Sequence, residues 1–328
     1  MISGAFQQWL VKSWYQRAWW LILLRPLEVF YRLATAQRRG LYKKDIRKAY
    51  RASVPVVVVG NITVGGTGKT AVVISLIEEL RERGLTVGVV SRGYGAVSAL
   101  RPRRLDQYST VEQVGDEPLQ IFRRTAAPCA VAASRAEAAR LLLKQCELDL
   151  IISDDGLQHP TLHRDLEIAL LDNRRGIGNG FCLPAGPLRE PVDRLWTVDF
   201  LLYRHGENEE TAVRYIPQAL INVASSEQRT PEAASLQASV HAVAGLGQPD
   251  QYFDFLRSLG FHPIEHAFPD HHKYEAKDLA HLDDLPVLMT EKDAVKCKDF
   301  AGANVWYLKI HAQLPPAVLD AVVTLARR

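Results

Sequence analysis

The sequence predicts an α/β fold with three parts: a domain built on a parallel sheet, a second and smaller α/β domain, and an N-terminal membrane-associated helix. Short apolar runs rich in valine and isoleucine alternate with helical patterns, which is typical of parallel sheets. A glycine-rich loop separates the first such pair. Residues 1–51 differ from the rest because they are basic and rich in tryptophan, and 328 residues are enough for more than one domain.

The elements of the first domain follow from apolar runs of strand length and from helical periodicity. Four consecutive valines give the first strand, and glycine and proline end most of the later runs. The elements expected are a strand at 56–59, a helix at 72–80, a strand at 86–90, an irregular or short-strand insertion at 96–114, a helix at 119–125, a strand at 130–132, a helix at 135–145, and strands at 148–153, 166–172 and 200–203.

A polar, acidic stretch then separates two patterns. Residues 205–212 are interpreted as a linker, and a second α/β pattern begins near residue 220. Its expected elements are a strand at 240–244, a helix at 251–259, strands at 287–290 and 305–309, and a helix at 316–325.

The loop after the first strand has the pattern of a phosphate-binding loop (P-loop). Glycines let backbone N–H groups turn inward around a phosphate, and the next helix adds the positive end of its dipole. Lys69 is expected to reach the β- and γ-phosphates, and the Thr70 hydroxyl to ligate Mg²⁺. The nucleotide-binding residues predicted here are Gly65, Gly66, Thr67, Gly68, Lys69 and Thr70.

This loop departs from the general pattern at one position. Thr63 stands where the pattern has glycine. The alternative interpretation is a glycine-rich turn that binds no ligand. The strand before the loop and the helix after it favour a nucleotide site, and with it a P-loop NTPase-type sheet domain.

Two aspartates end a later apolar strand. Asp154 and Asp155 follow residues 148–153, as the Mg²⁺-positioning acid does in P-loop enzymes. We therefore expect Thr70, Asp154 and Asp155 to hold the metal. The alternative is a pair of turn-forming acids behind a buried strand.

The N-terminal segment favours a membrane surface. Residues 1–51 hold eleven Lys/Arg, two acidic residues and four of the six tryptophans, although the whole chain has a net charge of only +3. The longest uncharged apolar run, 18–24, is far shorter than the roughly 20 residues needed to span a bilayer. Aromatic residues among cations are typical of an interfacial amphipathic segment. The alternative is a helix that packs on the protein's own core with a solvated basic face.

Several other features limit the function. The four cysteines are scattered without Cys-x-x-Cys spacing, so neither a zinc site nor a disulfide framework is predicted, and a cytoplasmic protein is expected. Residues 174–190 form a long loop rich in Gly, Pro and Arg, which favours handling of an anionic group. His271 and His272 lack a third metal ligand at suitable spacing, and a surface loop whose histidines cap a helix is an equally good interpretation.

Taken together, the motifs resemble those of the tetraacyldisaccharide 4'-kinase (lipid A 4'-kinase) family, and the resemblance covers nearly the whole chain. Each motif is weak alone, whereas seven in order are specific. They are residues 64–70, 91–95, 115–118, 154–159, 183–190, 270–272 and 290–293. The family often has proline after Gly-Lys-Thr, and Ala71 stands there in this chain, a position that we expect to lie outside the chemistry.

The resemblance implies a lipid kinase of lipid A biosynthesis. It implies transfer of the ATP γ-phosphate, with Mg²⁺, to the 4'-hydroxyl of a tetraacylated glucosamine disaccharide 1-phosphate. The expected location is the cytoplasmic face of the inner membrane, peripheral or monotopic, with no nucleic acid as partner. The expected parts are a membrane-associated segment at 1–36, a P-loop kinase domain at 37–212, a smaller α/β domain with two linker strands at 213–310, and a C-terminal helix at 311–328.

The resemblance also implies roles for individual residues. Asp116 is expected to be the base that takes the proton of the acceptor hydroxyl, with His271 rather than His272 as its partner, and Lys69 to stabilise the transferring phosphoryl group. The site would then be complete only when the two domains close. Further side chains expected near the site are Arg92, Tyr94, Glu117, Gln158, His159 and Arg189.

Two other classes of function remain open from sequence. A membrane-recruited P-loop ATPase switch explains the P-loop and the N-terminal segment but gives the Asp270–His272 motif no role. A kinase or ligase of the dethiobiotin synthetase type, acting on a soluble substrate, leaves the tryptophan-rich segment without a role.

Overall fold

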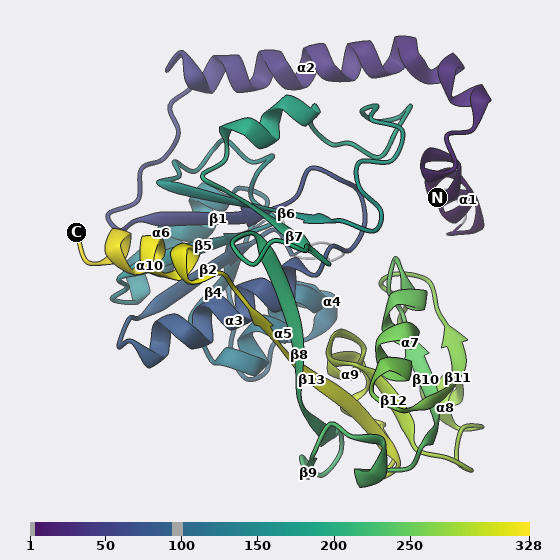
Figure 1. Cartoon of the computed structure of the whole chain (residues 1–328). Helices are drawn as coiled ribbons and strands as arrows, with labels where there is room; N and C mark the ends of the chain where they lie inside the picture. The colour runs from purple at the N-terminus through teal and green to yellow at the C-terminus, as the bar shows by residue number, and fades with distance from the viewer. Residues whose placement is uncertain (1–3, 94–100) are drawn as a thin grey trace.

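A computed structural model describes residues 4–93 and 101–328 of the chain. Two α/β halves share one continuous order of strands, and a helical arm lies along the outside (Figure 1). The elements are α1 (Gly4–Tyr15), η1 (Trp19–Leu24), α2 (Arg25–Lys43), β1 (Val56–Gly60), α3 (Lys69–Glu82), β2 (Val87–Ser91), β3 (Arg103–Arg104), α4 (Val111–Val114), α5 (Asp116–Thr125), β4 (Cys129–Val131), α6 (Arg135–Gln145), β5 (Leu150–Asp154), β6 (Leu166–Asp172), η2 (Val192–Thr197), β7 (Phe200–Arg204), β8 (Ala212–Asn222), β9 (Gln228–Arg229), η3 (Ala233–Ser235), β10 (Ser239–Ala244), α7 (Pro249–Ser258), β11 (His262–Ala267), α8 (Ala276–Leu279), β12 (Val287–Thr290), α9 (Glu291–Cys297), β13 (Val305–Gln313) and α10 (Pro316–Ala326).

The P-loop half comprises β1–β7 with α3–α6 and α10. Its strands follow the order β7-β6-β1-β5-β2-β4 in parallel pairs, with the short β3 antiparallel at the edge. Val57 and Val59 pack on one face, with α3, α5 and α10, whereas Val56 and Val58 pack on the other, with α6. A central strand buried on both faces explains the unbroken valine run. Each buried valine contributes about 1.5–3 kcal/mol.

The second half comprises β9–β12, the beginning of β13 and α7–α9. Its strands β11, β10, β12 and β13 are parallel, with α7 packed on one face and α8 and α9 on the other. The sequence analysis did not predict β11. Most of its side chains are partly or fully exposed and Pro263 lies within it, so this edge strand lacks a continuous apolar run.

Two long strands connect the halves. β8 and β13 pair antiparallel from Arg214–Gln313 to Asn222–Trp306, with a register shift between Lys309 and Ile310. They run side by side from one half into the other (Figure 1). These are the two linker strands that the family resemblance implies. The predicted linker at 205–212 ends where β8 begins, and the strand at 212–222 was missed because its half-exposed alternation gives a weak apolar signal.

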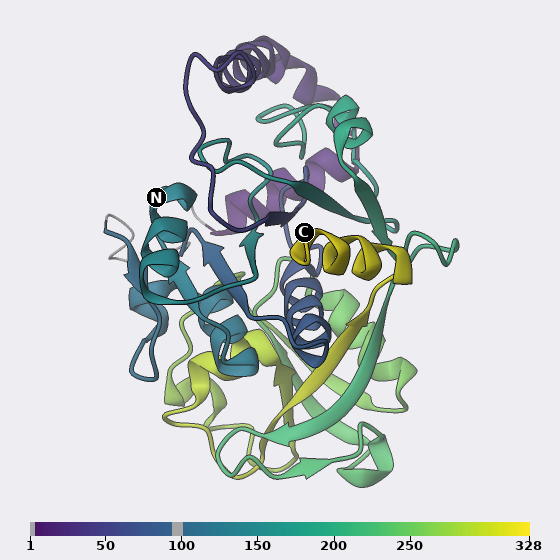
Figure 2. The same ribbon diagram turned by 90° about the vertical axis from the view of Figure 1, so that its left-hand side faces the viewer.

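The arm consists of α1, η1 and α2. In Figure 2, α2 is seen nearly end-on at the top of the molecule, away from both sheets. Trp14 and Leu21 are buried, whereas Trp19 is 81% and Phe30 72% exposed. α2 continues to Lys43, beyond the expected limit of this segment at residue 36. Among the described residues, no helix combines the length and the apolar character that a bilayer crossing requires.

Candidate functional site

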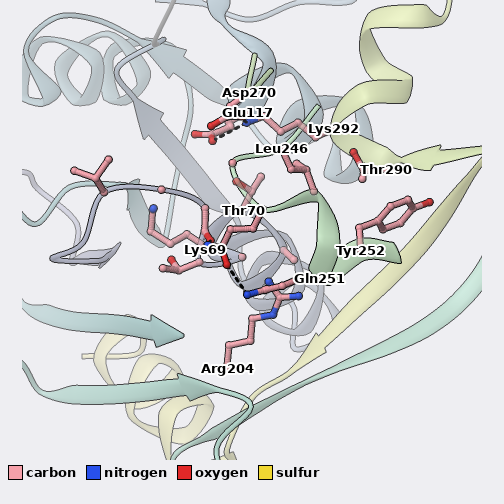
Figure 3. Close-up of a pocket in the computed structure, with 18 of the residues that line it drawn as sticks. Lys69, Thr70, Glu117, Arg204, Leu246, Gln251, Tyr252, Asp270, Thr290 and Lys292 are labelled. Carbon is pink, nitrogen blue, oxygen red and sulfur yellow. Dashed lines mark hydrogen bonds and ion pairs between the residues drawn. The ribbon is translucent and has the colours of Figure 1, made fainter. Parts of the chain in front are cut away.

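A cleft of about 2250 Å³ lies between the two halves and contains most of the residues that the sequence analysis selected. The P-loop and the starts of α3 and α5 line one side, and the loops after β10, β11 and β12 line the other. Residues of α1 close part of its rim. In Figure 3, Lys69 and Thr70 project from the P-loop, while Glu117, Asp270 and Lys292 lie together across the cavity.

The P-loop ends at an uncapped helix N-terminus. Gly68 adopts the left-handed conformation (φ +85°) as the N-cap of α3, and no side chain caps that helix end. Its first N–H groups are therefore available to an anion in the cleft. Tyr215 donates a hydrogen bond to the Gly68 carbonyl at 3.2 Å, and a Cβ at Gly68 would lie 2.2 Å from that tyrosine oxygen. The loop is thus shaped by β8 as well as by its own glycines.

Thr63 replaces the expected glycine without strain. It is not among the residues with positive φ, and its backbone pairs with Leu188 in an isolated bridge. The Asn61 amide donates to the hydroxyls of Thr63 and Thr67 at 3.4 and 3.3 Å, and these bonds tie the two ends of the loop together. Thr63 therefore departs from the sequence pattern without changing the shape of the loop.

Asp155 joins the P-loop to the long loop at 174–190. Its carboxylate lies 3.5 Å from Lys69 Nζ and accepts a 2.7 Å hydrogen bond from Arg189. Burial works to raise the pKa of Asp155, but the charges of Lys69 and Arg189 outweigh it and hold the pKa well below its ordinary range. Asp155 also has a left-handed backbone (φ 48°), which a non-glycine residue adopts only at a cost.

The neighbouring Asp154 fits a metal site. Its Oδ1 atom is buried without a hydrogen-bond partner, and Oδ2 lies 3.4 Å from the Ser91 hydroxyl. Burial, with the charges of Glu117 and Asp155, raises the pKa of Asp154. Orphaned carboxylate oxygen beside a phosphate loop suits Mg²⁺, which takes one or two protein ligands and completes its shell with water and phosphate. In the described ranges, no group of three or more His, Cys, Asp and Glu residues is arranged to hold a metal ion.

Asp116 and His271 meet across the cleft. Asp116 is the first residue of α5 and is 4% exposed, and His271 Nδ1 lies 2.9 Å from its Oδ2. Burial works to raise the pKa of Asp116, but the hydrogen bond from His271 and the charge of Lys292 outweigh it and lower the pKa well below its ordinary range. The same hydrogen bond raises the pKa of His271. His271, like Asp155, has positive φ (60°).

The other histidine of the motif serves the fold. His272 Nε2 lies 2.9 Å from Asp278 in α8, and its carbonyl accepts a hydrogen bond from Lys296. Its contacts thus belong to the second half. The helix-capping interpretation, which covered both histidines, agrees with the contact of His272 to α8 but not with that of His271 to Asp116.

Four further predicted residues line the cleft: Arg92, Glu117, Gln158 and His159. Gln158 donates to the carbonyl of Asn61 at 2.9 Å, which supports the P-loop. Burial, helped by nearby arginines, lowers the pKa of His159 to about 3. Tyr94 lies outside the described residues.

Sequence reasoning missed several side chains of the cleft, and three of them have clear contacts. Arg135, the buried first residue of α6, donates to the Asp154 carbonyl at 2.9 Å. Gln248 donates to the Gly66 carbonyl at 3.0 Å, which links the second half directly to the P-loop. Lys292, inside a recognised motif, lies beside Asp116. A helix-starting arginine or a loop glutamine carries no distinctive signal, so only the Lys292 motif offered a clue.

The arm also contacts the site. Tyr31 donates to the Arg189 carbonyl at 2.8 Å, and buried Glu28 accepts from the Cys182 amide at 3.0 Å. Because Arg189 in turn bonds Asp155, a single row of contacts runs from α2 to the P-loop.

A P-loop at a parallel sheet, paired aspartates beside its lysine, and a carboxylate–histidine pair in the same cleft define a P-loop phosphotransferase. A family model described as tetraacyldisaccharide-1-P 4'-kinase (LpxK) matches residues 20–327, and the chain belongs to that family.

Individual relatives agree with the family match. A tetraacyldisaccharide 4'-kinase of Pseudomonas aeruginosa is 49% identical over 316 residues, 95% of each chain. That of Azotobacter vinelandii is 49% identical over 314 residues, covering 95% of this chain and 94% of the other. The crystal structure of LpxK from Aquifex aeolicus in complex with ATP superposes with a TM-score of 0.77 at 28% identity, covering 93% of this chain and 99% of that one.

Proposed function

We propose that this chain transfers the γ-phosphate of ATP to the 4'-hydroxyl of a tetraacylated glucosamine disaccharide 1-phosphate. The observation that carries the proposal is that the P-loop and the Asp116–His271 pair open into one cleft. A nucleotide phosphate and an acceptor hydroxyl therefore have separate positions that face each other. The names of the relatives supply the identity of the acceptor.

Each side of the cleft has its own part in the reaction. Lys69 and the N–H groups at the start of α3 bind the phosphates and offset the charge on the transferring group. Asp116 accepts the proton of the acceptor hydroxyl as the new P–O bond forms and the bond to the leaving ADP oxygen breaks. The hydrogen bond from His271 orients that carboxylate.

Thr70, Asp154 and Asp155 are the residues that would hold Mg²⁺. The metal, when bound, neutralises phosphate oxygens and orients them. Asp155 also forms ion pairs with Lys69 and Arg189.

We also propose that the arm binds the cytoplasmic face of the inner membrane without crossing it. The exposed apolar side chains of the arm include Trp9, Trp19, Ile22, Leu23, Leu27, Phe30 and Leu33. The basic residues at 38–51 follow directly along the chain and add attraction to anionic headgroups. An enzyme bound in this way meets its acylated substrate at the membrane surface.

Transfer of labelled phosphate tests the activity. With γ-labelled ATP and detergent-dispersed acceptor, label should appear in the lipid, and release to water should be slow without the acceptor. Equal label release with and without acceptor would favour the ATPase switch instead. Transfer to a soluble acceptor would favour the second alternative.

Flotation with anionic vesicles tests the location. Changing Leu23, Phe30 and Leu33 to serine should reduce co-flotation about tenfold or more, because each change removes exposed apolar surface without disturbing a buried residue. Tyr108→Ser, at an exposed aromatic outside the arm, is the matched control. Unchanged flotation of the triple variant would contradict membrane binding through the arm.

A further inference from the structure

The motif at Thr290–Asp293 has one residue that the proposed reaction leaves without a role. Thr290 caps α9 by accepting from the Asp293 amide, and buried Asp293 accepts from the Gly245 amide at 2.9 Å. Glu291 accepts two hydrogen bonds from Arg124, each at 3.0 Å, and a third from Gln120 at 3.4 Å. These three residues stabilise the fold and the contact between the halves. Lys292 also lines the cleft, where its side chain lies close to Glu117 and Asp270 (Figure 3).

The Lys292 ammonium group lies among three carboxylates from two segments. Its Nζ is 3.2 Å from Asp270, 3.5 Å from Glu117 and 3.6 Å from Asp116 Oδ2. Asp116 and Glu117 begin α5 of the P-loop half, whereas Asp270 precedes His271 in the second half. The Lys292 side chain is only 13% exposed, so water screens these charges weakly. Lys292 therefore joins Asp116 to Asp270, the residue just before His271.

A second lysine on the same helix shows what a structural lysine does here. Lys296 Nζ is 3.0 Å from Asp293 and 3.2 Å from the His272 carbonyl, both within the second half, and it is 3.8 Å from Asp116. Its closest partners are thus residues that hold the fold. The partners of Lys292 all line the cleft, and two of them belong to the other half.

We propose that Lys292 is a positioning residue for phosphoryl transfer: it keeps Asp116 in the carboxylate form, directed at His271, and fixes α5 against the loop that carries this histidine. The proposal rests on the proposed role of Asp116. Loss of the ammonium group leaves three carboxylates close together, and their repulsion displaces the base. A displacement of about 1 Å is enough to cost about 10²-fold in rate.

The charge of Lys292 also predicts a direction for the pH profile. The groups that face Asp116 are His271 and Asp270 from the loop after β11, Lys292 and Lys296 from α9, and Glu117 from its own helix. Removing one of the cations raises the pKa of Asp116. The acid limb of kcat/KM should therefore move to higher pH in a variant that lacks the Lys292 charge.

The test compares Lys292→Met and Lys292→Gln with Lys292→Arg. Both neutral variants should lower kcat about 10²-fold with KM for ATP unchanged, and should move the acid limb upward. Lys292→Arg should keep most of the wild-type rate and leave the acid limb of kcat/KM at its wild-type pH. Lys298→Met, which removes an exposed lysine at the end of the same helix, should behave as wild type.

A second comparison separates this proposal from the proposed reaction. Asp116→Asn should be slow, and adding Lys292→Met to it should cost little more, because the lysine acts through the aspartate. If Asp116→Asn is slow but Lys292→Met turns over at the wild-type rate, the role of Lys292 is overturned and the proposed reaction stands. A fast Asp116→Asn would overturn both. Failure of both neutral variants to fold would show that Lys292 is structural.

Discussion

The two ends of the cleft are built in different ways. The phosphate end comes mainly from one continuous segment, in which β1, the P-loop and α3 follow each other within residues 56–82. The acceptor end brings together Asp116, His271 and Lys292, which come from α5, a loop of the second half and α9. The phosphate end therefore depends on local backbone geometry, whereas the acceptor end depends on how the two halves sit together.

The largest expected effect lies at the phosphate end. Lys69→Ala should lower kcat/KM by about 10³-fold or more, because it removes the cation that offsets charge on the transferring group. Steady-state phosphate transfer measures it, with circular dichroism as a check of folding. Lys144→Ala, an exposed lysine of α6, is the control. Near-normal turnover of a folded Lys69→Ala protein would contradict the role of Lys69 in phosphate binding, and with it the distinction between the two ends.

The second prediction concerns the acceptor end. Asp116→Ala and His271→Ala should each lower kcat by about 10²–10⁴-fold, with nucleotide affinity unchanged. The double change should cost little more than the worse single one, since the pair acts as a unit. His272→Ala, which loses a contact to Asp278 instead, should be milder. Additive losses would mean that the aspartate and the histidine act separately.

Removing a predicted metal ligand should have a smaller effect, again at the phosphate end. Asp154→Ala and Asp155→Ala should each raise the Mg²⁺ concentration needed for half-maximal rate, by about 10–100-fold, and excess Mg²⁺ should rescue at least one of them. A Mg²⁺ titration at saturating ATP measures this shift. Glu147→Ala, at an exposed acid just before β5, should leave the curve in place. Two unchanged curves would mean that the aspartates only form a turn.

The smallest effect is on stability. The raised pKa of His271 means that its contact with Asp116 stabilises the fold fully below the ordinary histidine pKa of about 6.5, and less as pH rises through the raised value. His271→Ala should therefore lower the free energy of unfolding more at pH 6 than at pH 9. The difference between the two pH values should be about 1 kcal/mol or less. Urea unfolding at the two pH values measures it. His262→Ala, at an exposed position of β11, should show no such difference.

The same contrast explains what sequence alone predicts. The P-loop, the paired aspartates and the buried strands have local patterns, so their positions follow from neighbouring residues. The Asp116–His271 contact joins residues that are 155 positions apart, and only the family resemblance suggested it. No local sequence signal predicts the hydrogen bond from Gln248 to the P-loop or the one from Tyr31 to the Arg189 carbonyl. β8 was missed because a half-exposed strand between two domains obeys neither domain's pattern.

The return of β13 to the P-loop half has a consequence for the order of folding during synthesis. α10 packs against α3, and its Val318 and Val322 complete the core that β1 and α3 begin (Figure 2). The ribosome makes α10 after every element of the second half. The nucleotide-binding core therefore stays incomplete while the second half is synthesised, and the nascent chain exposes the apolar face of α3 until α10 leaves the exit tunnel.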